Sequence, residues 1–124
     1  MDRIYMPLQK MPINKLTTAS GNIVSDVFDL NTFIRALLVD KTLLSPASLD
    51  QMTNFYTYKN TKSGLGLFED KYGNKLLRGH TGRQISYITY AYVDTQTNES
   101  MVVINKNAND ETIDKVFEQM CELK

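Results

Sequence analysis

Residues 85–93 constrain the fold of this chain more than any other segment, because both of their faces carry large apolar or aromatic side chains. Successive side chains of an extended strand point to opposite sides. One side carries Ile85, Tyr87, Thr89, Ala91 and Val93, and the other carries Ser86, Ile88, Tyr90 and Tyr92. A strand of this kind belongs in the interior of a sheet that is covered on both faces.

Segments on both sides of this strand have the period of amphipathic helices. Apolar residues recur at three- and four-residue steps over 25–39, at Val27, Leu30, Ile34, Leu37 and Leu38. Ser25 is the expected N-cap of this helix. Ser45 followed by Pro46 predicts the start of a second helix over 46–54.

A third helix is predicted over 110–123, with Asn109 as its cap. Its expected buried stripe consists of Ile113, Val116, Phe117, Met120 and Cys121. Because Cys121 falls on that stripe, we interpret it as a packed thiol and not as a reactive one.

The remaining pattern predicts a small antiparallel sheet over 63–105. Short apolar runs flank a turn at 70–74, with Gly73 available for positive φ, and another apolar strand is expected at 101–104. Residues 1–22 are expected to be an irregular lead-in, and 56–62 a solvated linker. The predicted fold is a single α+β domain over 1–124: two helices within 25–54, three to four antiparallel strands, and one C-terminal helix packed on the sheet.

Composition excludes several classes of function. The 14 Lys and Arg residues balance 14 Asp and Glu residues, whereas general nucleic-acid binders and anionic-membrane binders carry a basic excess. One cysteine and one histidine cannot form a disulfide framework or a Cys-cluster metal site, so we predict neither metal nor cofactor. No run approaches the ~18 apolar residues needed to span a bilayer.

The strongest candidate for chemistry is the stretch Gly79-His80-Thr81-Gly82, which the pattern places between two strands. Glycines permit unusual backbone angles and close approach of a ligand. His80 offers a titratable donor, Thr81 offers a hydroxyl, and the backbone N–H of Arg83 could point at a developing oxyanion. Taken alone, a single histidine beside glycines in a hairpin is more often structural than functional.

The order of several motifs resembles the serine β-lactamase-like family, which includes class C β-lactamases, D-alanyl-D-alanine carboxypeptidases and related esterases. The matching stretches, spread over 19–122, are Ala19-Ser20-Gly21-Asn22-Ile23-Val24-Ser25 with Asp29-Leu30 and Phe33, then Leu43-Leu44-Ser45-Pro46, Gly64-Leu65-Gly66-Leu67, Gly79-His80-Thr81-Gly82 and 101–105. The fourth stretch is similar to the family's Lys-Thr-Gly or His-Thr-Gly motif on the strand that lines the active site. The resemblance implies a partial β-lactamase/transpeptidase-like fold.

The resemblance also implies roles for four positions. His80 takes the place of the cationic residue that orients the substrate carboxylate, and its charge would depend on pH, unlike that of a lysine. The Thr81 hydroxyl binds the same carboxylate or a carbonyl, Gly82 lets the strand pass close to the ligand, and the Arg83 N–H is one oxyanion donor. Residues 83–87 are shorter than the family's usual step and lack its glycine.

No catalytic residue is assigned within this chain. The family's nucleophile motif, Ser-x-x-Lys, does not occur in it, and neither does a Gly-x-Ser-x-Gly elbow or a phosphate loop. Tyr58-Lys59-Asn60 and Tyr72-Gly73-Asn74 match the letters of the family's Tyr-x-Asn motif, but they come after the first matched segment, so we interpret both as coincidental.

The first hypothesis is therefore the C-terminal segment of a serine hydrolase that is inactive alone. The complete protein would act on a small-molecule or peptidoglycan-like substrate, namely a β-lactam, a D-Ala-D-Ala peptide or an ester, and the resemblance implies export or a bacterial cell-envelope location. The second hypothesis is a non-catalytic module that pairs through a sheet edge or an apolar face, with itself or with a complementing N-terminal segment. A small stand-alone ligand-binding domain is the third.

Overall fold

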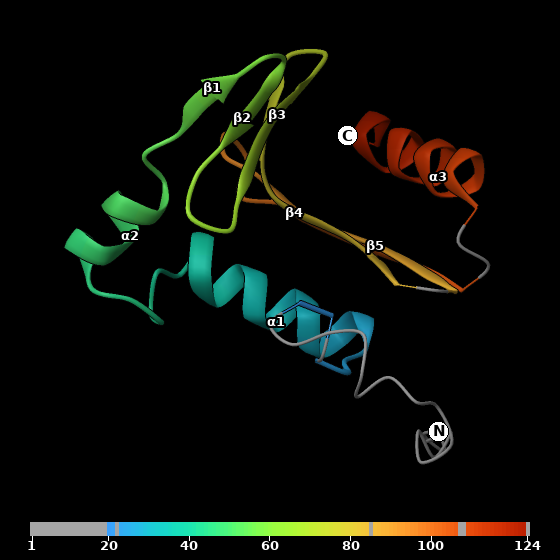
Figure 1. The fold of residues 1–124 in the computed structure, drawn as a ribbon, viewed down its shortest axis with the longest axis horizontal. Coiled ribbons are helices and arrows are strands. Elements are labelled where there is room, and N and C mark those ends of the chain that lie inside the picture. The colour runs from blue at the N-terminus through green and yellow to red at the C-terminus, as the bar shows by residue number, and fades with distance from the viewer. Residues whose placement is uncertain (1–19, 22, 85, 107–108, 124) are drawn as a thin grey trace.

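The computed structural model describes residues 20–21, 23–84, 86–106 and 109–123, and it has the predicted α+β architecture (Figure 1). The helices are α1 (Val27–Leu38), α2 (Pro46–Met52) and α3 (Asp110–Glu122). The strands are β1 (Tyr56–Tyr58), β2 (Thr61–Ser63), β3 (Phe68–Tyr72), β4 (Lys75–Gln84), β5 (Tyr87–Asp94) and β6 (Ser100–Asn105). The lead-in expected over 1–22 lies outside the described residues, apart from 20 and 21.

The six strands form one sheet in the order β1-β2-β3-β4-β5-β6, with every neighbouring pair antiparallel. The prediction of three to four strands was too low, because 56–63 forms the β1–β2 hairpin and not a linker. Both of these strands are largely exposed and polar, so they lack the apolar alternation that marks a strand. In the turn between them, Lys59 adopts a positive φ of 55°. A glycine at this position would have indicated a turn in the sequence, but lysine does not.

The helices cover opposite faces of the sheet, as expected: α1 lies on one side of β5 and β6, and α3 lies on the other (Figure 1). The prediction that the central strand is buried on both faces is confirmed for β5. Val93 pairs with Ser100, whose hydroxyl contacts Asn31 of α1, while Tyr92 packs against Phe117 of α3. Both Val93 and Tyr92 are buried.

The main apolar core lies between the sheet and α3. Its buried members are Leu77, Tyr92, Met101 and Cys121, with Tyr72, Tyr90, Phe117 and Met120 packed around them. The predicted stripe of α3 is confirmed at Ile113, which is fully buried, and at Cys121. Val116 is wrongly included in it, since its side chain is 38% exposed.

Helix caps explain where the helices begin. Ser45 and Asn109 cap α2 and α3 as predicted. The cap of α1 is Asp26 and not Ser25, because the Asp26 carboxylate accepts hydrogen bonds from the backbone N–H groups of Phe28 and Asp29, both at 2.9 Å. A carboxylate at this position also interacts favourably with the helix dipole. Among the described helices, none has the length and apolar character that crossing a bilayer requires.

Cys121 is expected to be chemically inert in the folded protein. Its side chain is buried, its sulfur lies 3.8 Å from Sδ of Met101, and burial raises the pKa of the thiol. We expect a thiol reagent at pH 8 to react at least ~100-fold more slowly with the native protein than with the urea-unfolded protein. Equal rates in the two states would contradict this placement.

Candidate functional site

The Gly-His-Thr-Gly stretch lies within β4, so the prediction that it sits between two strands is wrong. The register of β4 with β5 continues without interruption from the Leu77–Asp94 pair to the Gln84–Tyr87 pair. Neither Gly79 nor Gly82 has a positive φ. These glycines therefore do not break the strand, and the chain reverses only after Gln84.

The two glycines differ in what surrounds them. A Cβ at Gly79 would overlap the backbone of β5, colliding with the carbonyl oxygen of Ala91 and lying 2.7 Å from Cα of Tyr92. A Cβ at Gly82 would meet nothing within 4 Å. Gly79 thus allows β4 and β5 to approach closely, and Gly82 leaves open space beside the strand.

The end of β4 that carries the motif is paired on one side only by the described strands. Its register with β3 stops at the Phe68–Gly79 pair, whereas the pairing with β5 goes on through His80–Ala91, Thr81–Tyr90 and Gly82–Thr89. Residues 80–82 consequently form a strand edge within the sheet. Such an edge can bind an extended peptide backbone or an amide-containing ligand.

His80 and Thr81 place two different functional groups at this edge. The His80 side chain is exposed, and its ring stacks on Phe68 with centroids 4.8 Å apart and planes at 22°. This contact restrains the imidazole without burying it. Thr81 is half-buried and, with Phe68 and Tyr90, lines the groove described below.

Arg83 joins the motif strand to the C-terminal helix. Its guanidinium forms an ion pair with the carboxylate of Asp110, in the first turn of α3. The expected role of Arg83 concerned only its backbone N–H, so this side-chain contact is an addition. It restrains the backbone that would carry the oxyanion donor.

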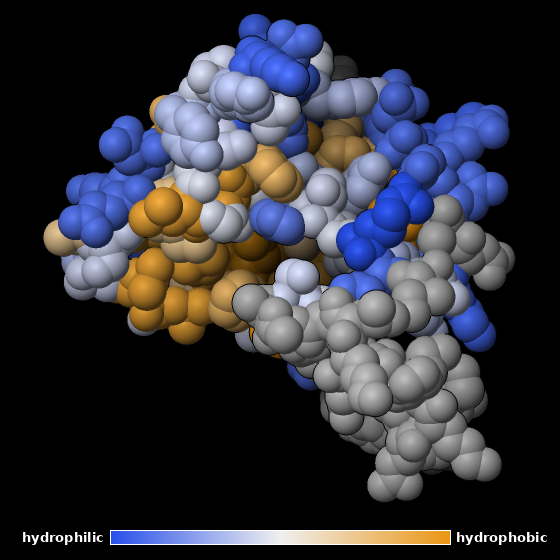
Figure 2. Space-filling view, in the orientation of Figure 1, coloured by the Kyte–Doolittle hydropathy of each residue, from blue (hydrophilic) through white to orange (hydrophobic). Residues whose placement is uncertain are grey.

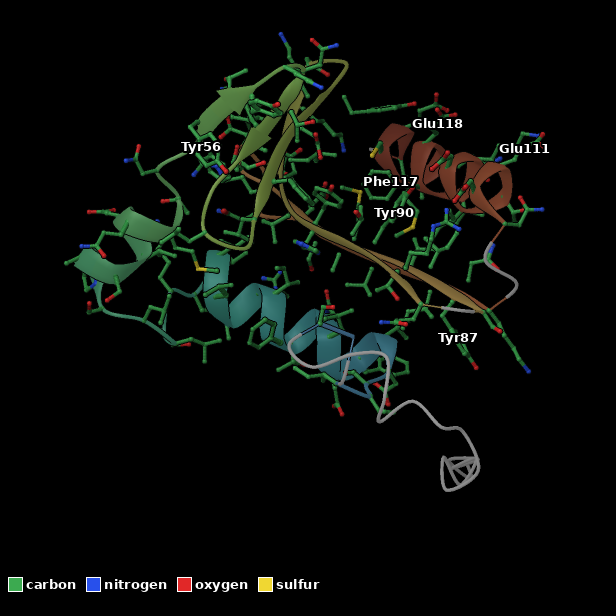
Figure 3. All side chains as sticks on the ribbon, viewed as in Figure 1. Tyr56, Tyr87, Tyr90, Glu111, Phe117 and Glu118 are labelled. Carbon is green, nitrogen blue, oxygen red and sulfur yellow. The ribbon has the colours of Figure 1, made fainter. Side chains whose placement is uncertain are left out.

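An open groove of about 400 Å³ lies between β3, β4, β5 and α3. It is lined by Thr61, Phe68, Asp70, Lys71, Tyr72, Leu77, Thr81, Tyr90, Tyr92 and Phe117. Figure 3 shows Tyr90 and Phe117 facing each other between β5 and α3, where their rings meet edge to face at 5.3 Å. Half of the lining residues of the groove are thus aromatic, and the rest include two threonines and two charged side chains.

Two tyrosines of the groove, Tyr90 and Tyr92, are hydrogen-bond donors and not bases near neutral pH. The Tyr90 hydroxyl donates to Asp114 and the Tyr92 hydroxyl donates to Asp70, each at 2.7 Å. Burial, followed by the bond to Asp114, raises the pKa of Tyr90 to about 12. Burial and the bond to Asp70 raise the pKa of Tyr92 as well. Both phenols therefore stay protonated and fix the groove wall.

Among the hydrogen bonds of the described residues, those of the serines do not include a basic partner that would activate a nucleophile. No described serine hydroxyl is hydrogen-bonded to a described lysine, histidine or carboxylate side chain. No group of three or more metal-ligating side chains gathers among these residues either. Tyr58-Lys59-Asn60 and Tyr72-Gly73-Asn74 occupy the β1–β2 and β3–β4 turns.

No protein-family model matches the chain. Its structure is similar to a D-stereospecific amidohydrolase from a Streptomyces species, with a TM-score of 0.67 and 28% sequence identity over 81% of this chain. It is also similar to the D-amino acid amidase from Ochrobactrum anthropi SV3, solved with D-phenylalanine, with a TM-score of 0.67 and 21% identity over 79% of this chain. The chain covers only 31% and 35% of these two proteins.

These similarities confirm the predicted fold class, a partial β-lactamase-like fold. Both neighbours are hydrolases of that fold, so the chain resembles a fragment of such an enzyme.

Proposed function

We propose that this chain is the C-terminal segment of a β-lactamase-like serine hydrolase, supplying the strand that binds substrate but not the nucleophile. The observation that carries the proposal is the position of His80, Thr81 and Gly82 on a strand stretch paired on one side only, in a fold shared with two amidohydrolases over about four fifths of the chain. The aromatic and hydroxyl groups next to this edge suit an amide or ester substrate with an apolar side chain.

Each motif residue has a chemical role in this proposal. A serine hydroxyl from another segment gives up its proton and attacks the substrate carbonyl carbon; the C–N or C–O bond then breaks, and the leaving amine or alcohol takes up the proton. Water attacks the resulting acyl-enzyme, which releases the carboxylic acid and returns the proton to the serine. The Arg83 N–H donates to the oxyanion, and the serine's own N–H is the second donor. The Thr81 hydroxyl binds the substrate carboxylate or carbonyl, the His80 imidazolium orients the same anionic group, and Gly82 leaves room for the ligand.

The substrates that we propose for the complete protein are amides or esters of D-amino acids, D-Ala-D-Ala peptides and β-lactams, in an exported or cell-envelope location. The missing two thirds would also cover apolar surface. Figure 2 shows such surface beside α2, and the connection between α1 and α2 exposes Leu43 and Leu44.

The test uses purified chain, D-phenylalanine amide, a chromogenic β-lactam and a short-chain nitrophenyl ester. We expect no turnover above buffer from the chain alone, since removal of the nucleophile leaves only binding and oxyanion contributions. We further expect the reading frame upstream of Met1 to encode Ser-x-x-Lys, and the product that includes it to hydrolyse at least one of these substrates. His80→Ala should then lower kcat/KM by about 100-fold.

His80→Lys is the matched control, because it keeps a cation at the same position. It should restore the activity that His80→Ala loses, because a cation at this position can still bind the anionic group of the substrate. Turnover by the chain alone that disappears in His80→Ala would overturn the proposal, as would an upstream frame without Ser-x-x-Lys.

A second candidate is a non-catalytic module that associates through a sheet edge. The outer edge of β6 favours it, because this strand is apolar and is the last of the sheet in the described chain.

A further inference from the structure

His80 and Thr81 are neighbours on β4, so an extended strand sends their side chains to opposite faces of the sheet. The register agrees, because His80 pairs with Ala91 and Thr81 pairs with Tyr90, the residue before it on β5. Thr81 and Tyr90 line the groove on the α3 side of the sheet. The proposed function requires both His80 and Thr81 to bind one anionic group of the substrate. A contact outside the strand must therefore bring the imidazole toward the groove.

The ring of Phe68 supplies this contact. It stacks on the imidazole of His80, with ring centroids 4.8 Å apart, and it lines the same groove as Thr81. The pairing of β3 with β4 stops at the Phe68–Gly79 pair, so no described strand pairs with β4 on this side beyond it. The imidazole reaches the phenyl ring at this open edge. The stack thus holds the imidazole next to the groove that Thr81 lines.

Phe68 is well supported by the sheet. Its backbone pairs with Ser63 of β2 and with Gly79 of β4, and the next residue, Glu69, is buried and forms ion pairs with side chains of β2 and β4. The Phe68 side chain is half-buried, whereas that of His80 is exposed. Ordering an exposed side chain at the moment of binding costs conformational entropy. A ring that the sheet already fixes lowers this cost for the imidazole.

We propose that Phe68 is a positioning residue of the motif, whose ring holds the His80 imidazole at the strand edge so that His80 and Thr81 bind the same anionic group. This inference rests on the proposed function. The flat face of the ring is what the role requires, because the two ring planes lie only 22° apart. Phe68→Leu keeps an apolar side chain but removes that face, and Phe68→Tyr keeps the face.

The first measurement uses the purified chain. It contains one histidine, so the ring protons of His80 can be identified directly in a proton NMR spectrum. We expect them to lie upfield of those of an unstacked histidine at pH 8.5, where the neutral form of an imidazole predominates, because they lie over the Phe68 ring. Phe68→Leu should move them downfield, and Phe68→Tyr should leave them in place. Slow reaction of the Cys121 thiol confirms that each variant is folded.

The second measurement uses the longer product that includes Ser-x-x-Lys. Phe68→Leu should lower its kcat/KM by about tenfold, and Phe68→Tyr should retain activity. In the His80→Ala background, Phe68→Leu should change kcat/KM by less than about twofold, because the ring then has no imidazole to hold. A merely structural role of Phe68 would lower kcat/KM by the same factor in both backgrounds.

Equal losses in the two backgrounds would overturn the inference, as would His80 ring protons that Phe68→Leu leaves in place. Both results leave the proposed role of His80 intact, so they are distinct from a failure of the proposed function. Unchanged activity in His80→Ala, or a longer product without activity, would overturn the proposed function and this inference together.

Discussion

Replacing Gly79 with alanine is expected to lower the free energy of unfolding by about 3 kcal/mol or more. The added methyl group would collide with the carbonyl oxygen of Ala91 and lie 2.7 Å from Cα of Tyr92. Both of these are backbone atoms of a strand held from its two sides by β4 and β6, so no side-chain rotation relieves the overlap. The substitution must push β4 away from β5, next to the buried Tyr92.

Gly82→Ala is the matched control, since it lies on the same strand three residues later and its new Cβ meets nothing within 4 Å. We expect its free energy of unfolding, measured by urea denaturation, to lie within about 0.5 kcal/mol of the unchanged chain. Equal losses in the two variants would mean that both glycines matter through the backbone freedom of glycine, and would contradict the packing explanation.

Most of the fold could be predicted because the helices and strands that are buried have a clear period of apolar side chains in the sequence. The helical stripe at Ile34 and Leu37, the cap at Ser45 and the doubly apolar strand before Asp94 all follow from sequence and are confirmed. The β1–β2 hairpin could not be predicted in this way. Its residues face solvent on both sides, so backbone pairing to β3 forms it and no hydrophobic pattern marks it.

The candidate site shows a similar division. The motif residues were proposed as a site from their chemistry and from the resemblance, and their role stays a prediction; their place in the fold was misjudged because the glycines were taken as breaks between strands. The contact of Phe68 with the motif could have been predicted from the sequence. A two-residue turn at Gly73 and Asn74 fixes the register of the hairpin and places Phe68 opposite Gly79. The ion pair of Arg83 with Asp110 could not have been predicted, because these residues are 27 positions apart and only tertiary packing brings them together.

Arg78→Met is expected to lower the free energy of unfolding by about 2 to 3 kcal/mol at pH 7. Glu69 is buried in β3, and its carboxylate accepts hydrogen bonds from Lys62 at 2.7 Å and Arg78 at 2.9 Å. These bonds join β2, β3 and β4 just before the motif. Removing Arg78 leaves a buried carboxylate with one partner, whose own side chain is 52% exposed. Lys62→Met should therefore cost less, under about 1 kcal/mol.

The pH dependence separates this electrostatic loss from lost packing of the Arg78 guanidinium on the ring of Phe55, 5.0 Å away. Burial alone would raise the pKa of Glu69, but the hydrogen bonds from Lys62 and Arg78 outweigh it and hold the pKa below 4.5. The pair thus stabilises the fold above that pH, and this contribution is lost as the pH falls through the lowered folded-state pKa. The cost of Arg78→Met, measured at pH 7 and at pH 3, should be largest at pH 7 and shrink as the pH falls and Glu69 becomes protonated. Packing does not titrate, so an equal loss at both pH values in urea denaturation would show that the ion pair contributes little.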